Sequence, residues 1–229
     1  MTIFEKTGPV NTEETLNIAL KTAKERNLDI VVASSEGDTA LSLMQKAKEA
    51  GFAGKIVCVS CAYGSKTPGE NRFSQERRTT LEQNGIRVVT AAHALSGGER
   101  GLTKMFGSVH PVELIAYTLR MFGQGTKVCV EVALMALDCG SISYGKPIVA
   151  IGGSGRGADT ACVLTPGYTA NLMETKIHEI LCKPSLMTEE PRYTIKKENG
   201  GARNEKQRRR FCVQNVLEFC RVLYYNLKI

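Results

Sequence analysis

Two short segments of the sequence combine glycine, hydroxyl and charged side chains in a way that suits an anionic ligand. The first is SSEGDT, residues 34–39, and the second is GGSGRGADT, residues 152–160. Backbone N–H groups at a helix start or in a glycine-rich loop bind phosphate, and an arginine adds a planar cation. The residues expected to contact the ligand are Ser34, Ser35, Gly37, Thr39, Gly153, Ser154, Gly155, Arg156, Gly157 and Thr160.

Each segment also has an interpretation without a ligand. The hydroxyl groups of the first can simply cap the helix that follows, and the carboxylates of Glu36 and Asp38 repel a phosphate unless they point away. The second contains G-x-G-x-x-A, residues 153–158, which is similar to a dinucleotide-binding fingerprint. That motif must open a helix, whereas the next residues, TACVLTPG, are typical of a strand, so we reject it. A phosphate cradle and a flexible turn between two strands both remain open.

Cys61 and His93 are the candidates for catalysis. Each follows a predicted strand, at the end where open α/β sheets carry their functional groups. The histidine would serve as acid or base and the cysteine as nucleophile. A structural histidine and an unreactive thiol are the alternatives. Glu131 lies in an apolar helical segment, and the pattern leaves open whether it is exposed or faces a polar cleft.

Cys58 and Cys61 form a C-x-x-C pair, but we expect no metal there. The pair lies in KIVCVSCAYG, which alternates like a strand, so residues three apart face opposite sides of the sheet. A structural zinc site needs further ligands, and the sequence has no second close cysteine pair. The eight cysteines are scattered through apolar segments, which favours reduced, buried thiols.

The elements that would position these groups alternate between helix and strand. The fold class predicted from this alternation is α/β, with three layers and a mostly parallel five-stranded sheet. The fifth strand follows the fourth too closely for a crossover helix, so we expect it to pair antiparallel at the edge. The first and fourth strands should be neighbours. The predicted helices span residues 11–27, 37–51, 74–85, 110–123 and 126–140, and the predicted strands span 28–34, 55–60, 86–92, 146–153 and 160–167.

Charge divides the chain into two parts. Residues 1–182 hold 19 Lys and Arg against 18 Asp and Glu, while residues 183–229 hold 11 against 5. The first part is therefore expected to be one domain that does not bind nucleic acid, and the second a basic tail that is disordered or loosely docked. Neither a signal peptide nor a membrane-spanning run is recognisable, so we expect a cytoplasmic protein without membrane contact.

Residues 10–182 resemble the stand-alone archaeal and bacterial proteins classed as pyruvate kinase C-terminal α/β domain-like, whose function is uncharacterised. The segments that carry the resemblance are NTEETL, VVASSEGDTAL, HALSG.ER, FGQGTKVCVEVALMALDCG, GGSGRGADTACVLTP and HEILCKP. In pyruvate kinase this domain holds a sugar bisphosphate between a loop similar to residues 34–39 and one similar to residues 152–160. At the position where the pyruvate kinase loop has a hydroxyl side chain, this sequence has Glu36 instead. Stand-alone relatives are associated with flavin mononucleotide (FMN), whose ring Tyr63 or Tyr144 would flank.

Three functions follow as hypotheses. The leading one is binding of a phosphate-containing small molecule, with FMN as the expected cofactor. The second is an enzyme that acts on a small phosphorylated metabolite through His93 and Cys61. The third is a regulatory or assembly module without catalysis, in which the chain would form a homo-oligomer. Pyruvate kinase activity is not expected, because 229 residues cannot hold both the catalytic barrel and this domain.

Overall fold

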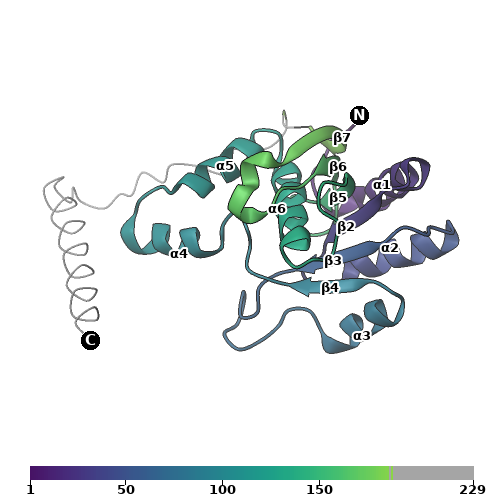
Figure 1. Ribbon diagram of the computed structural model, residues 1–229, viewed down its shortest axis with the longest axis horizontal. Coiled ribbons are helices and arrows are strands. Elements are labelled where there is room, and N and C mark those ends of the chain that lie inside the picture. Colours follow the sequence, from purple (N-terminus) through teal and green to yellow (C-terminus); the bar gives the residue numbers. More distant parts are fainter. Residues whose placement is uncertain (186, 188–229) are drawn as a thin grey trace, which may run out of the picture.

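One sheet of seven strands organises residues 1–185 and 187, which the computed structural model describes (Figure 1). The strand order is β1-β7-β6-β5-β2-β3-β4. Strand β6 is antiparallel to both of its neighbours, and the other neighbouring strands are parallel. The strands are β1 (Thr2–Phe4), β2 (Asp29–Ala33), β3 (Ile56–Ser60), β4 (Arg87–Thr90), β5 (Ile148–Gly152), β6 (Thr160–Thr165) and β7 (Lys176–Pro184).

Helices cover both faces of this sheet. On one face α1, α2 and α3 bury Leu16, Leu43 and Leu81 against the strands. On the other face α5 and α6 form a second core, and α4 lies beside α5 (Figure 1). The α/β class and the mostly parallel sheet are therefore confirmed. The helices are α1 (Thr12–Arg26), α2 (Asp38–Glu49), α3 (Gln75–Gln83), α4 (Gly97–Phe106), α5 (Pro111–Arg120) and α6 (Gln124–Asp138), with short 3-10 turns η1 (Pro9–Asn11) and η2 (Thr169–Glu174).

The sheet has seven strands in the described residues instead of the five that the sequence predicts. Strand β1 is only three residues long, which is too short to leave a periodic pattern. The first half of β7 is exposed and carries Lys176, His178 and Glu179, so the segment lacks the apolar run of a buried strand. The β5–β6 pairing is antiparallel as predicted, but β7 and β1 continue the sheet beyond β6, which is therefore not the edge.

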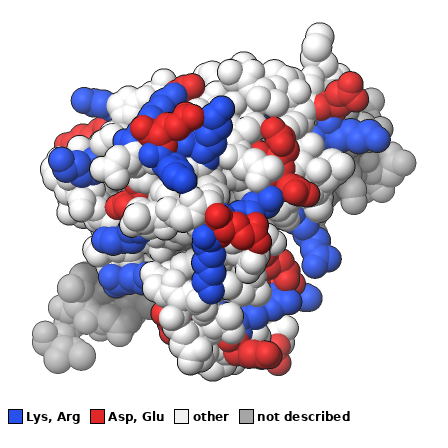
Figure 2. Space-filling view, turned by 90° about the vertical axis from the view of Figure 1, so that its right-hand side faces the viewer, with Lys and Arg blue, Asp and Glu red and all other residues white. Residues whose placement is uncertain are grey.

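The predicted basic tail begins inside the fold. Lys183 and Pro184 complete β7, and the Ser185 amide donates to the Phe4 carbonyl at 2.7 Å. Residue 186 and residues 188–229, which make up most of the predicted tail, lie outside the described residues. Over the face shown in Figure 2, acidic and basic side chains are intermixed, in agreement with the balanced charge of residues 1–182. Among the described residues, no helix is long and apolar enough to cross a membrane.

The order of the strands reverses between β2 and β5. After β2 the chain adds β3 and then β4 on one side, while β5 pairs with the other side of β2. The prediction that these two strands are neighbours in the sheet is confirmed. Loops that leave parallel strands on either side of such a point diverge to opposite faces and leave a crevice at the carboxyl ends. The segments 34–39 and 152–160 leave β2 and β5 at this place.

Candidate functional site

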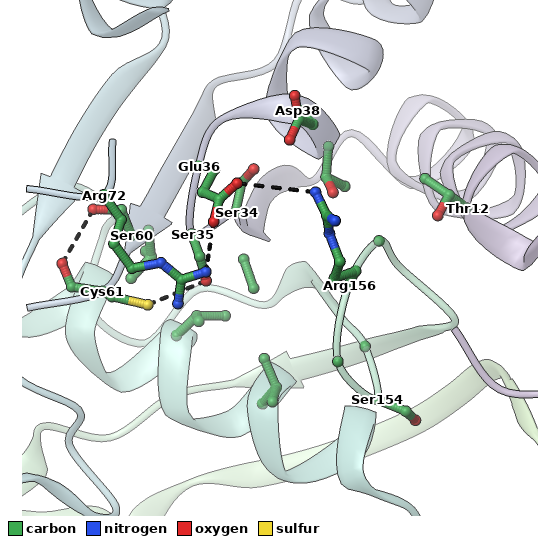
Figure 3. A pocket seen from close by; sticks show the side chains of 18 of the residues that line it. Thr12, Ser34, Ser35, Glu36, Asp38, Ser60, Cys61, Arg72, Ser154 and Arg156 are labelled. Atoms are coloured by element: carbon green, nitrogen blue, oxygen red, sulfur yellow. Dashed lines mark hydrogen bonds and ion pairs between the residues drawn. The ribbon is translucent and has the colours of Figure 1, made fainter. Parts of the chain in front are cut away.

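A cavity of about 760 Å³ lies at the carboxyl ends of β2, β3 and β5 (Figure 3). Its walls come from the loop before α2, the loop between β5 and β6, the residues after β3 and one side of α6. Polar groups gather around its mouth, and Val59, Val128, Val132 and Met135 supply an apolar part. A concave site of this volume, at the carboxyl ends of the strands where their order reverses, is typical of small-molecule sites in open α/β sheets.

The N-terminus of α2 opens towards the cavity, and its cap residue has no side chain. Gly37 occupies the cap position with a φ of 101°, a conformation that favours glycine. A Cβ on Gly37 would also come within 3.0 Å of the Phe73 ring. The Ser34 hydroxyl accepts from the Ala40 amide at 3.4 Å. The positive end of the helix dipole is therefore available to an anion.

Arginines compensate the two carboxylates of this loop. Arg72 lies 2.6 Å from Glu36, and their hydrogen bond lowers the pKa of the Glu36 carboxyl. Arg77 pairs with Asp38 at 2.9 Å and donates to the Glu36 carbonyl at 2.7 Å. Arg156 reaches across the cavity to 4.0 Å from Glu36 (Figure 3). The repulsion that Glu36 and Asp38 would exert on a phosphate is therefore reduced by neighbouring cations.

The glycine-rich turn between β5 and β6 is held by a buried side chain, Asp159. Its Oδ2 accepts from the amides of Gly8, at 2.8 Å, and Ser154, at 3.1 Å. Its Oδ1 accepts from the Thr160 hydroxyl at 2.8 Å. Arg156 lies at the tip of the turn, and its side chain is 84% exposed. The turn is therefore fixed at its base, while Arg156 presents an exposed guanidinium with a long ion pair, 4.0 Å, to Glu36.

Cys61 and His93 lie together on the other side of the cavity. The Cys61 thiol donates to the Ser35 hydroxyl at 3.1 Å, and it also interacts with the His93 imidazole. The interaction with His93 lowers the pKa of the Cys61 thiol, burial raises it, and the hydrogen bond with Ser35 lowers it further. The same contact with Cys61, followed by that with Glu131, raises the pKa of His93 to about 9. Cys61 and His93 therefore shift each other's pKa in opposite directions, down for the thiol and up for the imidazole.

Glu131 on α6 faces the cavity, which decides the alternative that the sequence left open. Its Oε2 lies 2.9 Å from Nδ1 of His93, and its Oε1 lies 2.5 Å from Nζ of Lys127. The Leu95 amide and the Ser96 hydroxyl also donate to Oε1, at 3.0 and 3.4 Å. The side chains of this ion pair are almost fully buried, with 2% of Glu131 and 3% of Lys127 exposed. Their spacing of four within an apolar helix is the sequence signal for this pair.

The structure brings most of the predicted site residues into this one cavity. Gly37 lies just behind the lining as the cap of α2, and Thr160 lies behind the loop, where it packs against Gly125. Tyr63 and Tyr144 do not border the cavity, and Tyr144 stacks on Tyr168 instead. The predicted residues that line the cavity are Ser34, Ser35, Thr39, Cys61, His93, Gly153, Ser154, Gly155, Arg156 and Gly157.

Sequence reasoning missed four contributors to the site. Arg72 belongs to a loop without periodicity, and Asp159 was taken only as part of the turn. Lys127 and the inward orientation of Glu131 depend on how α6 is rotated against the sheet. In the residues that the structure describes, no cluster of three or more His, Cys, Asp or Glu side chains is arranged to hold a metal ion.

Comparison of the chain with models of known protein families gives no match. Evidence for a function therefore comes from the chemistry of the cavity.

Proposed function

We propose that this protein binds a phosphate-containing small molecule in the cavity between the α2 N-terminus and the β5–β6 turn. The observation that carries this proposal is that the segments 34–39 and 153–157, more than a hundred residues apart in the chain, line the same cavity. The phosphate would accept hydrogen bonds from the first amides of α2, and Arg156 would neutralise its charge.

FMN is the first ligand to test. It joins one phosphate to an apolar ring system, and the cavity offers a polar mouth together with Val128, Val132 and Met135 on α6. The resemblance to pyruvate kinase C-terminal domain-like proteins, with their association with FMN, supports the same choice as a proposal. Neither Tyr63 nor Tyr144 lines the cavity, so the ring would pack on aliphatic and thioether side chains.

Thermal unfolding with FMN, riboflavin and inorganic phosphate tests the proposal. At roughly 1,000 times a micromolar Kd, a ligand that binds only the folded protein stabilises it by about 4 kcal/mol. For a domain of this size, that raises the midpoint by about 10 °C. Riboflavin, which lacks the phosphate, is expected to raise it less. If none of the three compounds changes the midpoint, the proposal is wrong.

Arg156→Ala separates the phosphate contact from general effects on the fold. The variant is expected to lose most of the shift with FMN and to keep its midpoint without ligand, because the Arg156 side chain is exposed. Arg26→Ala is the matched control. Arg26 is also an exposed arginine with one ion pair, to Glu179, but it lies at the end of α1 and does not line the cavity. Equal FMN shifts in the two variants would contradict the role given to Arg156.

A further inference from the structure

The arrangement of Cys61, His93 and Glu131 has the features of a nucleophilic centre. The three residues come from three separate places, the end of β3, the segment after β4 and the middle of α6. All three line the cavity. Nδ1 of His93 is engaged by Glu131, so Nε2 is the ring nitrogen left for Cys61. This is the order of nucleophile, base and orienting carboxylate that defines a catalytic triad.

Glu131 is held in one position by donors on every side. Lys127, the Leu95 amide and the Ser96 hydroxyl occupy its Oε1, which leaves Oε2 directed at His93. Glu131 and its buried cationic partner Lys127 form a first pair, which carries no net charge. The second pair, formed by Cys61 and His93, is then free to exist as thiolate and imidazolium without a net charge in the cavity wall.

Cys61 also differs from three of the buried thiols. Burial raises the pKa of Cys58 to about 12 and that of Cys182 to about 11, and it raises the pKa of Cys129 as well. Cys61 is only partly buried, and its partners act in the opposite direction. A thiolate, rather than a thiol, is the form of cysteine that attacks electrophiles.

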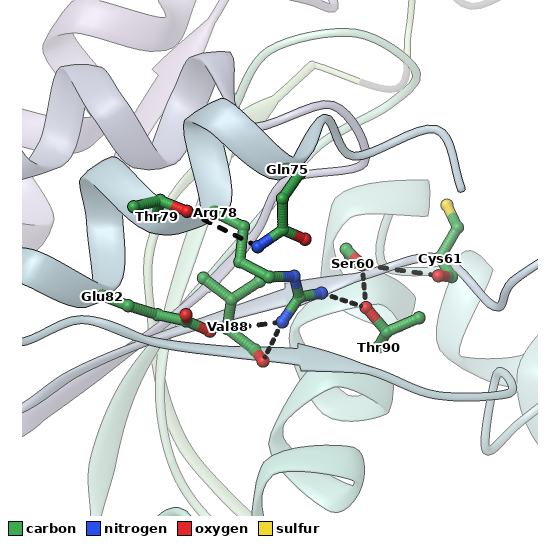
Figure 4. A network of polar contacts seen from close by, with 8 residues as sticks. All are labelled: Ser60, Cys61, Gln75, Arg78, Thr79, Glu82, Val88 and Thr90. Atoms are coloured by element: carbon green, nitrogen blue, oxygen red, sulfur yellow. Dashed lines mark hydrogen bonds and ion pairs between the residues drawn. The ribbon is translucent and has the colours of Figure 1, made fainter. Parts of the chain in front are cut away.

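A polar network behind Cys61 fixes its backbone (Figure 4). Arg78 on α3 donates to the Val88 carbonyl at 2.9 Å and to the Thr90 hydroxyl at 2.5 Å. The Thr90 hydroxyl bonds that of Ser60 at 3.1 Å, and the Ser60 hydroxyl donates to the Cys61 carbonyl at 3.4 Å. The chain on either side of the β3 end is thus tied to Thr90 at the end of β4, the strand after which His93 follows.

We infer that Cys61 is a catalytic nucleophile that hydrolyses an activated ester or thioester on an anionic small molecule, with His93 as acid and base and Glu131 as the positioning residue. The anionic part of this inference rests on the proposed function, because Arg156 and the α2 N-terminus would hold that group. The acyl chemistry rests on the triad alone.

The steps balance without an additional oxidant or cofactor. The Cys61 thiolate attacks the carbonyl carbon, so a C–S bond forms and the carbonyl electrons move to oxygen. When they return, the bond to the leaving group breaks, and Nε2 of the His93 imidazolium gives its proton to that group. Neutral His93 then takes a proton from water, which attacks the acyl carbon. The C–S bond breaks, the acid leaves, and thiolate and imidazolium are restored.

Reaction of the full chain with p-nitrophenyl acetate tests the acyl step. The expected result is a burst of p-nitrophenolate with one equivalent of acetyl group, located on the Cys61 peptide by mass spectrometry. Cys61→Ala is expected to abolish the burst, and His93→Gln to slow it about 100-fold. Cys139→Ala, which removes another partly buried thiol outside the cavity, is the control and should react like the native chain. An acetyl group spread over other cysteines, or a burst that survives in Cys61→Ala, would overturn the inference.

The pH dependence of alkylation by iodoacetamide supplies a second test that needs no variant. The groups that face Cys61 and His93 are Arg72 with its partner Glu36, from the loops, and Glu131 with Lys127, from α6. Since the pKa of Cys61 is lowered, its alkylation rate should be half-maximal below pH 9.0, the ordinary value. Glu131→Gln should move this midpoint upward, and Glu131→Asp should partly restore it. A native midpoint at or above pH 9 would contradict the thiolate.

A comparison of two esters addresses the anionic substrate. Mono-p-nitrophenyl succinate carries a carboxylate, and p-nitrophenyl acetate does not. The succinate ester is expected to have the higher kcat/KM, and Arg156→Ala should reduce that preference at least tenfold. If the two esters react equally while Cys61 is acylated, the anionic substrate class is wrong and the nucleophile stands. If FMN, riboflavin and phosphate all fail to bind and Cys61 is still acylated, the proposed function is wrong and the triad stands.

Discussion

Glu131 is a buried carboxyl group whose ionisation is decided by its partners. Burial raises the pKa of Glu131, but the hydrogen bond with His93 and the charge of Lys127 outweigh it, so the pKa falls to about 2. Lys127 shows the opposite balance, since burial lowers its pKa more than Glu131 raises it. The pair is therefore a site where small changes in packing alter the charge that His93 experiences.

This balance predicts an acid-sensitive stability. Because the folded pKa of about 2 lies below the ordinary 4.5, the contribution of Glu131 is complete above pH 4.5 and is lost as the pH falls towards 2. The loss amounts to about 3 kcal/mol at most. Urea unfolding at pH 7 and pH 3 measures it. Glu131→Gln is expected to be destabilised by about 3–5 kcal/mol at pH 7, since Lys127 then loses its partner, and to lose less between the two pH values. An identical pH dependence in both proteins would contradict this.

The β5–β6 turn acts as one element because its glycines permit a close approach to the N-terminal segment. Gly157 has a φ of 70°, and a Cβ there would overlap the Thr12 hydroxyl and come within 2.8 Å of the Pro9 Cα. The Thr12 hydroxyl in turn accepts from the Ala158 amide at 3.0 Å. The position of Arg156 in the cavity therefore depends on a contact between the turn and η1 and α1.

Gly157→Ala tests the turn as a unit. The strained φ and the overlap with Pro9 should destabilise the fold by about 1–3 kcal/mol and displace the turn, with loss of the FMN shift. Gly98→Ala is the control, because Gly98 lies in α4 with no atom near its would-be Cβ and should keep or slightly raise the stability. The measurement is thermal unfolding of both variants with and without FMN. An unchanged FMN shift in Gly157→Ala would show that the conformation of the turn does not contribute to FMN binding.

The two ends of the described chain meet at one edge of the sheet. Strand β1 pairs with β7, and Ser185 bonds back to Phe4. The segment after β1 then places Gly8 against Asp159, which lies 151 positions away in the sequence. The N-terminal residues thus close one edge of the sheet and support the wall of the cavity in the same run of chain.

Asp159→Ala should weaken this long-range connection. The substitution leaves the buried Gly8 amide and the Ser154 amide without their acceptor, and each such loss costs about 1–3 kcal/mol. We expect a total destabilisation of about 3 kcal/mol and faster hydrogen exchange at residues 2–11 and 153–158 together. Thr165→Ala is the control. Thr165 lies on β6, and its hydroxyl forms an exposed hydrogen bond with Nε2 of His178. Faster exchange in only one of the two segments would show that Asp159 does not connect them.

Local patterns in the sequence were sufficient to predict the central elements of the sheet. Apolar runs such as Ile30–Val32 predicted buried parallel strands, and β2 and β5 confirm the expectation that the first and fourth predicted strands are neighbours at a reversal of strand order. From that reversal followed the expectation that the serines after β2 and the glycines after β5 lie at one place. Hydrophobic periodicity and connection length are short-range properties, so they can be recognised without coordinates.

Only the tertiary structure decided which groups meet in the cavity. Cys61, His93 and Glu131 are separated by more than 30 residues from one another, and their contact depends on the register of β3 with β4 and on the rotation of α6. The same holds for β7 and β1, whose pairing lies at opposite ends of the described chain. These contacts arise when the whole sheet and its second core close together, because no local pattern specifies how one face of a helix is turned towards distant strands.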